Sequence, residues 1–169
     1  MAIILSALTL LIGVFFSFVG SIKCGGGAIN PPMYEMQLGV IGQRYQPALA
    51  TQFEKVAPPV AAWFRQLPAK HVLVLAGAPE LLFGVVCLLS LVGVFSGVAN
   101  QMNKLMVIFM VSGPMAAHWF GDDWSLPNDH PNGPTGIIPA AVCTVLVVIR
   151  LLLLPSGNAK TSSGKAKKA

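Results

Sequence analysis

The residue with the clearest chemical potential in this sequence is a carboxylate that interrupts an uncharged stretch. Glu80 is the single acidic or basic residue between positions 71 and 93, apart from a histidine at the first of them. A carboxylate surrounded by hydrocarbon costs several kcal/mol unless it is paired, protonated or solvated. Glu80 shares a helical face with Gly77 and Gly84, at spacings i, i+3 and i+7, so we expect it to point toward a neighbouring helix.

Four more polar residues are predicted to share a site with Glu80. At a rise of about 1.5 Å per residue, Glu80 lies roughly 14 Å, and Arg150 roughly 21 Å, from the same side of the membrane. We therefore expect these two side chains to meet directly or through a water. Lys23, His118 and Asp122 are predicted to form a polar cluster at the mouth, above Glu80.

Two interpretations of these polar residues stay open. They could form a pocket that binds a ligand or relays protons, or an internal ion-pair network that sets the register of the helices. The sequence contains no complete catalytic motif. Cys24, Cys87 and Cys143 are isolated, with no CxxC pair, which favours packing roles over thiol–disulfide exchange or a zinc site. We expect no catalytic residues, no metal site and no cofactor.

The composition excludes an ordinary soluble domain. Apolar residues make up 54% of the chain and charged residues only 10%, whereas soluble domains carry about 25% charged residues. Lipid must therefore solvate much of the surface. The net charge of +5 arises mainly from lysines after position 159. We interpret these as a solvated tail, so nucleic acid is not an expected partner.

Four stretches are long and apolar enough to cross a membrane as helices of about 20 residues. They are residues 2–22, 71–93, 99–120 and 136–154. The predicted fold is an all-α membrane protein, a bundle of four transmembrane helices over residues 1–154, with both termini in the cytosol. A disordered basic tail is predicted over 155–169. The alternative, a cleaved signal peptide at the start, lacks a basic n-region and has too long an apolar run.

Residues 23–70 are predicted to form a long loop. Gly25, Gly26, Gly27, Pro31 and Pro32 are expected to prevent regular structure at its start. Short helices are expected over 45–55 and 60–66, at the membrane interface or folded back on the mouth of the bundle.

Small residues are predicted to let the helices pack closely. Gly13, Ser17 and Gly20 share one face of the first span, and Gly77 and Gly84 share one face of the second. Lipid tails are as apolar as leucine, so helix association in a membrane depends on such close approaches and on polar contacts. Pro114 is expected to kink the third span.

These residues, in this order, resemble the DoxX-like membrane proteins, and within them the branch that includes the nicotinic acetylcholine receptor chaperone. The resemblance extends over residues 8–154 in span order and spacing. Its matching elements are residues 15–23, Gly77-Ala78-Pro79-Glu80 with Gly84, Val98-Ala99-Asn100, His118 with Gly121-Asp122, and Arg150-Leu151-Leu152. Asn100 thereby joins the predicted intramembrane polar cluster. The chain departs from the chaperone branch in a longer first loop and an insertion over 123–135, in loops where partner contacts usually lie.

The resemblance implies a four-helix membrane bundle. Its chaperone branch resides in the endoplasmic reticulum and assists the assembly of receptor subunits, and other relatives are linked to quinone-dependent sulfur oxidation. We expect a non-enzymatic multi-pass protein that assists, or is an accessory subunit of, a larger membrane complex, with the bilayer and other membrane subunits as partners. The alternative is a quinone-linked redox component. Residues 165–169 fit a dilysine retrieval pattern for the endoplasmic reticulum; the mitochondrial inner membrane and the bacterial plasma membrane are alternatives.

Overall fold

The computed structural model describes residues 2–126 and 137–154, and every regular element in these two ranges is helical. The predicted all-α class is confirmed. The α-helices are α1 (Ala2–Cys24), α2 (Pro31–Val40), α3 (Gln46–Val56), α4 (Pro58–Gln66), α5 (Ala69–Leu91), α6 (Ser96–Met110), α7 (Ala116–Gly121) and α8 (Ile137–Leu153). Two π-helical turns, η1 (Ile41–Tyr45) and η2 (Val111–Met115), join α2 to α3 and α6 to α7.

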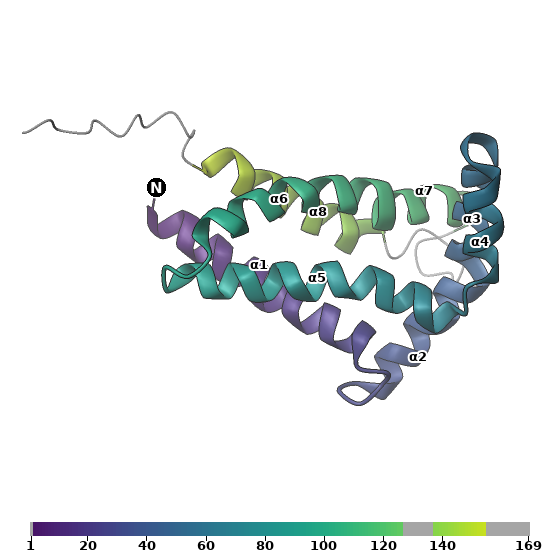
Figure 1. Cartoon of the computed structure of the whole chain (residues 1–169), viewed down its shortest axis with the longest axis horizontal. Coiled ribbons are helices and arrows are strands. Elements are labelled where there is room, and N and C mark those ends of the chain that lie inside the picture. Colours follow the sequence, from purple (N-terminus) through teal and green to yellow (C-terminus); the bar gives the residue numbers. More distant parts are fainter. Residues whose placement is uncertain (1, 127–136, 155–169) are drawn as a thin grey trace, which may run out of the picture.

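The helices form a lengthwise bundle with a cross-piece at one end. In Figure 1, α1, α5, α8 and the combined α6–α7 helix run along the molecule, and α3 and α4 stand across one end. The start of α1, the α5–α6 turn and the end of α8 lie together at the opposite end. The predicted tail, its dilysine pattern and most of the loop before α8 lie outside the described residues.

Two helices, α1 and α5, meet the length and hydropathy needed to cross a membrane. Helix α8 is apolar but shorter. These three helices occupy the ranges predicted for the first, second and fourth spans. The third predicted span is covered by α6, η2 and α7, which follow one another without a break.

The prolines of segment 23–70 begin helices, so the prediction that Pro31 and Pro32 prevent regular structure was wrong. Pro31 occupies the first position of α2, and the Asn30 side chain accepts a hydrogen bond from the backbone N–H of Met33 at 3.2 Å. Proline is favoured at this position because its fixed φ suits the helix and the missing N–H would have no helical partner. Pro58 begins α4 in the same way. The short helices predicted over 45–55 and 60–66 are α3 and α4.

Pro114 causes a change of helix type at the site of the predicted kink. It lies inside η2, where the hydrogen-bond pattern widens to that of a π-helix. A proline removes one helical hydrogen bond and crowds the preceding turn, and a π-helical turn relieves both. A second π-helical turn, η1, lies just before Pro47.

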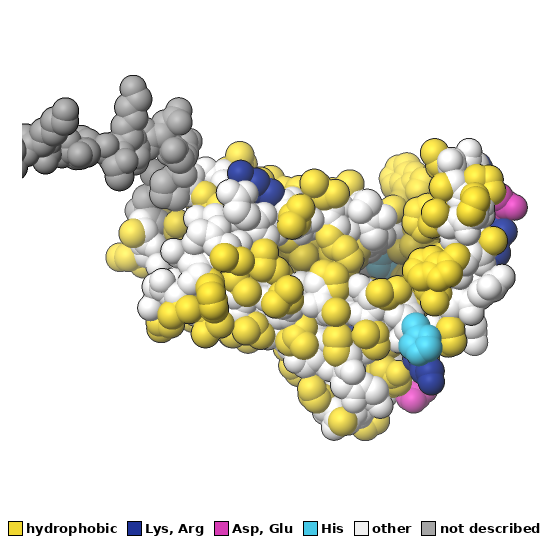
Figure 2. Space-filling view, in the orientation of Figure 1, with side chains coloured by type: hydrophobic (Ala, Val, Ile, Leu, Met, Phe, Trp, Pro, Cys, Tyr) yellow, Lys and Arg dark blue, Asp and Glu magenta, His cyan; other side chains and the backbone are white. Residues whose placement is uncertain are grey.

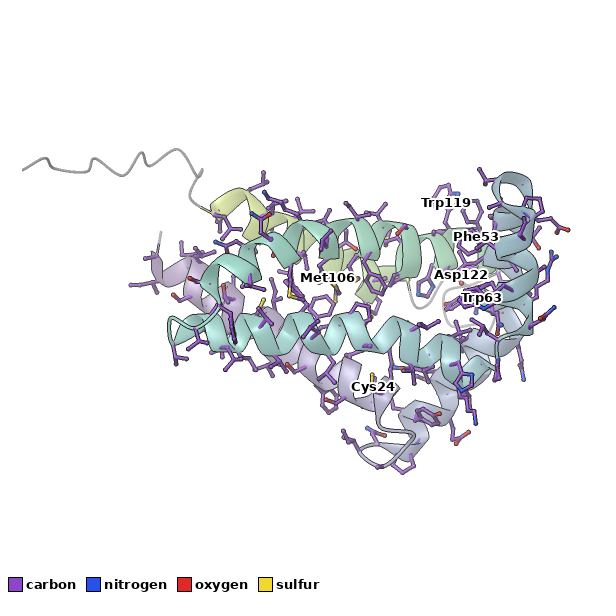
Figure 3. The ribbon with its side chains drawn as sticks, in the orientation of Figure 1. Cys24, Phe53, Trp63, Met106, Trp119 and Asp122 are labelled. Carbon is purple, nitrogen blue, oxygen red and sulfur yellow. The ribbon has the colours of Figure 1, made fainter. Side chains whose placement is uncertain are left out.

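Helices α1 and α5 pack so closely that glycines are needed where they meet. A Cβ atom added at Gly20 would lie 2.8 Å from the Gly77 carbonyl oxygen and 2.7 Å from the Leu81 Cα. A Cβ added at Gly84 would lie 2.6 Å from the Ser17 Oγ. Because these separations are below normal contact, only glycine allows this approach of the two backbones. Next to this contact lies a core of buried side chains from four helices, which includes Phe16, Phe83, Met106 (labelled in Figure 3) and Val147.

Candidate functional site

A cavity of about 640 Å³ lies between the helices, toward the end that carries α3 and α4. Its wall is mainly apolar, with aromatic side chains that include Phe16, Phe53, Phe64 and Phe109. Figure 2 shows the surface hollowed beside α3 and α4. Both π-helical turns contribute to the wall. A cavity of this size and lining is typical of sites for small apolar molecules.

Glu80 lies in the cavity wall and is paired with Lys23. The Lys23 Nζ lies 2.6 Å from Oε1 and 2.7 Å from Oε2 of the carboxylate, and both side chains are largely buried. Lys23 is in the last turn of α1 and Glu80 is near the middle of α5. A Cβ at Gly77 would collide with the Cβ of Lys23. The glycine therefore makes the space through which Lys23 reaches the carboxylate.

A second polar group closes the cavity at the end near α3 and α4. Asp122 accepts a hydrogen bond from Arg44 Nη2 and lies 3.0 Å from Nδ1 of His118. Arg44 Nε also donates to the Gly121 carbonyl at 2.9 Å. The Tyr45 hydroxyl lies 2.7 Å from the same Nδ1 of His118. These residues tie η1 to the end of α7, and Figure 3 shows Asp122 at the same end as Phe53 and Trp63.

The protons in this group can be assigned from its contacts. A carboxylate accepts hydrogen bonds only, so Nδ1 of His118 carries a proton and donates it to Asp122. Burial raises the pKa of Tyr45 above its ordinary value, and the Asp122 carboxylate raises it further, while Arg44 lowers it. Tyr45 is therefore a neutral phenol. Its hydroxyl oxygen lies 2.7 Å from Nδ1 of His118 and can act as a second acceptor for the same N–H.

Arg150 belongs to a separate polar group, away from the cavity wall. It is 2% exposed and lies where α1, α6 and α8 meet. Its Nε donates to Thr9 Oγ1 at 3.0 Å, its Nη1 to Asn103 Oδ1 at 2.9 Å, and its Nη2 to Asn100 Oδ1 at 3.5 Å. Within the two described ranges, these oxygens are its hydrogen-bond partners, and all of them are neutral.

The predicted contact between Glu80 and Arg150 was therefore wrong. Depth alone had suggested the pair, but helix packing decides which side chains meet. The glycine contact turns the Glu80 face of α5 toward α1, whereas Arg150 on α8 faces α6 and the start of α1. Asn100 lies beside Arg150 and not near Glu80. Of the predicted cluster at the mouth, His118 and Asp122 do meet, but Lys23 does not join them, because it pairs with Glu80.

Sequence reasoning missed four polar residues of these groups and a fifth that lies outside them. They are Thr9, Asn103, Arg44, Tyr45 and Gln46, whose Nε2 donates to the backbone carbonyls of Phe64 and Leu67 and so holds α3 against α4. Asn103 follows Asn100 at the i, i+3 spacing of one helix face, which was a usable signal. Tyr45 and Gln46 lie at the start of a predicted short helix, but the sequence alone did not indicate which other helices their side chains, or that of Arg44, would meet.

Comparisons of the chain with models of protein families, with curated proteins and with solved structures found no match. The resemblance to the DoxX-like proteins stays a prediction. In residues 2–126 and 137–154, no three His, Cys, Asp or Glu side chains gather as metal ligands would. These residues can form hydrogen bonds at the wall of an apolar cavity. Their charges are compensated within ion pairs.

Replacing Asn103 by alanine is expected to lower the free energy of unfolding by about 1–3 kcal/mol, because a buried guanidinium then loses its closest acceptor. Asn103 is 0% exposed and also donates to the Val147 carbonyl at 3.0 Å. Asn100→Ala is the matched control, since its oxygen lies at 3.5 Å and its side chain is partly exposed. Unfolding in mixed micelles measures the loss of free energy for both variants. Equal losses for the two variants would contradict this role of Asn103.

Proposed function

We propose that this chain is a multi-pass membrane protein in which α1, α5, α6–α7 and α8 cross the bilayer and enclose a binding site for an apolar, membrane-soluble molecule. The cavity of about 640 Å³, apolar along its wall and polar at defined points, is the observation that carries the proposal. Apolar cavities with a few converging polar groups are the usual form of small-molecule sites, and the space between bundle helices is a usual place for them.

The distribution of side chains supports a lipid environment for the bundle. Large apolar side chains are exposed on each lengthwise helix, among them Leu10 on α1, Leu82 on α5, Leu105 on α6 and Ile138 on α8. Glu80, Asn103 and Arg150 are buried instead. Figure 2 shows a face covered mainly by hydrophobic side chains, with charged groups toward its ends. Polar groups inside and apolar groups outside are expected when lipid is the solvent.

Exposed tryptophans indicate where the boundary of the membrane would lie along the bundle. Trp63, Trp119 and Trp124 are each about half exposed or more, and Figure 3 shows Trp63 and Trp119 at the end that carries α3 and α4. Tryptophan is enriched at the level of the lipid headgroups. This end of the bundle would then lie at one interface, with the mouth of the cavity near it.

An accessory role in a larger membrane complex is the second candidate function. The resemblance to the DoxX-like proteins favours it, and so does the α3–α4 pair, which stands across the bundle with Val56, Val60 and Trp63 exposed. An apolar surface outside the bundle offers a contact for another membrane subunit. The endoplasmic reticulum is the proposed compartment, because the resemblance to the chaperone branch of the DoxX-like proteins implies it. In the quinone-linked alternative, the same cavity would hold a quinone.

Photolabelling tests the cavity. We expect a long alkyl probe that carries a mid-chain diazirine, added to phosphatidylcholine vesicles containing the protein, to label peptides with cavity residues. Ala76→Phe, which fills part of the cavity wall, should reduce this labelling several-fold. Ala78→Phe is the matched control on the same helix, because Ala78 is exposed and outside the wall. Equal labelling of both variants would contradict a cavity site.

Membrane insertion has its own test. The expressed chain is expected to stay in the membrane pellet after an alkaline carbonate wash and to enter solution only with detergent. Release by carbonate alone would contradict the proposed four-span topology.

A further inference from the structure

A histidine in the cavity wall has one ring nitrogen whose nearest partner among the described residues is distant. His118 is 9% exposed and lines the cavity. In the neutral imidazole, donation from Nδ1 to Asp122 leaves a lone pair on Nε2, which can accept a hydrogen bond. The nearest partner of Nε2 is the Tyr45 hydroxyl at 3.4 Å, but this hydroxyl lies closer, at 2.7 Å, to Nδ1, so its contact with Nε2 is the longer and weaker of the two. His118 thus offers the cavity an acceptor held in place by a carboxylate.

A second acceptor in the wall is also unsatisfied. The side-chain oxygen of Gln37, on α2, is buried and has no hydrogen-bond partner. Gln37 lines the same cavity. A buried acceptor without a partner costs about 1–3 kcal/mol. Because this oxygen is buried in the present conformation, a hydrogen-bond donor in the cavity would reach it, and remove the penalty, once the Gln37 side chain rotates. Two hydrogen-bond acceptors on residues of the cavity wall favour a ligand that carries a hydrogen-bond donor.

The charges of the cavity wall favour a neutral ligand. Lys23 is paired with Glu80, and Arg44 with Asp122. Each positive group therefore has its own carboxylate, and the sum of these four charges is zero. An ionised ligand would have to leave water without a counter-charge, or to break one of the pairs, and either change is costly in an apolar cavity.

We propose that the cavity selects an uncharged lipid that carries a hydroxyl group, and that His118 Nε2 accepts the hydrogen bond from this hydroxyl. This inference rests on the proposed function, since it names the chemical class of the ligand of the same cavity. Gln37 provides the second acceptor, for a further hydroxyl of the same lipid. Asp122 acts as a positioning residue, because it holds the imidazole with Nδ1 as donor and Nε2 as acceptor.

Three diazirine probes of equal chain length test this selection in phosphatidylcholine vesicles. One ends in a methyl group, one in a primary hydroxyl and one in a carboxylate. The hydroxyl probe is expected to label cavity peptides roughly fivefold to tenfold more than the methyl probe, from one buried hydrogen bond. The carboxylate probe is expected to label them least. Equal labelling by the methyl and hydroxyl probes would overturn the inference and leave the cavity site standing. Absence of cavity labelling by all three would overturn both proposals.

Variants at two histidines identify the residue responsible. His118→Leu is expected to remove the preference for the hydroxyl probe while labelling by the methyl probe continues. His118→Gln, which keeps an acceptor, should retain part of the preference and guards against a leucine variant that fails to fold. His71→Leu is the matched control, because His71 is exposed on α5 and outside the cavity wall. A hydroxyl preference that survives in a folded His118→Leu protein would overturn the role of this nitrogen.

Discussion

Replacing Lys23 by methionine is expected to lower the free energy of unfolding by about 3–5 kcal/mol, because it leaves the Glu80 carboxylate buried without its partner. The Lys23 amine bonds both carboxylate oxygens, and the side chains are 14% and 4% exposed. Removal of one member of such a pair costs more than the pair itself contributes. Unfolding midpoints in mixed micelles measure this loss.

The companion variants separate charge from packing. Lys104→Met removes a lysine that is exposed on α6, and it should change stability little. The double variant Lys23→Met with Glu80→Met should recover most of the loss, because apolar replacement of both members of a buried pair is often neutral or stabilising. A double variant no more stable than Lys23→Met would show that the loss came from packing, and it would contradict the uncompensated-charge account.

Gly20→Ala is expected to lower the free energy of unfolding by about 1–3 kcal/mol, because it overpacks the α1–α5 contact. The added methyl group would meet the backbone of α5 at Leu81 and Gly77, and a backbone cannot move aside as a flexible side chain can. Gly77→Ala should be at least as damaging. Its methyl group would collide with Lys23 and so disturb the ion pair with Glu80.

Gly39→Ala is the matched control for this contact. Gly39 lies in α2, and no atom lies within 4 Å of an added Cβ. Alanine forms helices better than glycine by up to about 1 kcal/mol, so this variant should match or exceed the stability of the original chain. Thermal unfolding in detergent compares the three variants. A Gly20→Ala protein as stable as Gly39→Ala would contradict the close packing of α1 on α5.

Much of the helical structure could be predicted from the sequence, and the errors of that prediction have a physical cause. Long uninterrupted apolar runs locate α1, α5 and α8 well, because this signal is averaged over many residues. The prediction for the start of segment 23–70 failed because Pro31 and Pro32 were taken as helix breakers, although a proline at the first helical position is favourable. Because α2 and η1 were not predicted, Arg44 and Tyr45 could not be identified as the residues that close the cavity next to Asp122.

By itself, the sequence determined that Glu80 must lie inside a helical bundle, because a carboxylate in an apolar stretch has to be compensated. It also determined that glycines would bring helices together, since their spacing places them on one face. Only the tertiary structure decided which cation compensates Glu80. The approach of α1 to α5 brings Lys23 to the carboxylate and leaves Arg150 among neutral oxygens. Such a choice depends on which helix faces meet, and the order of residues along a single helix does not contain that information.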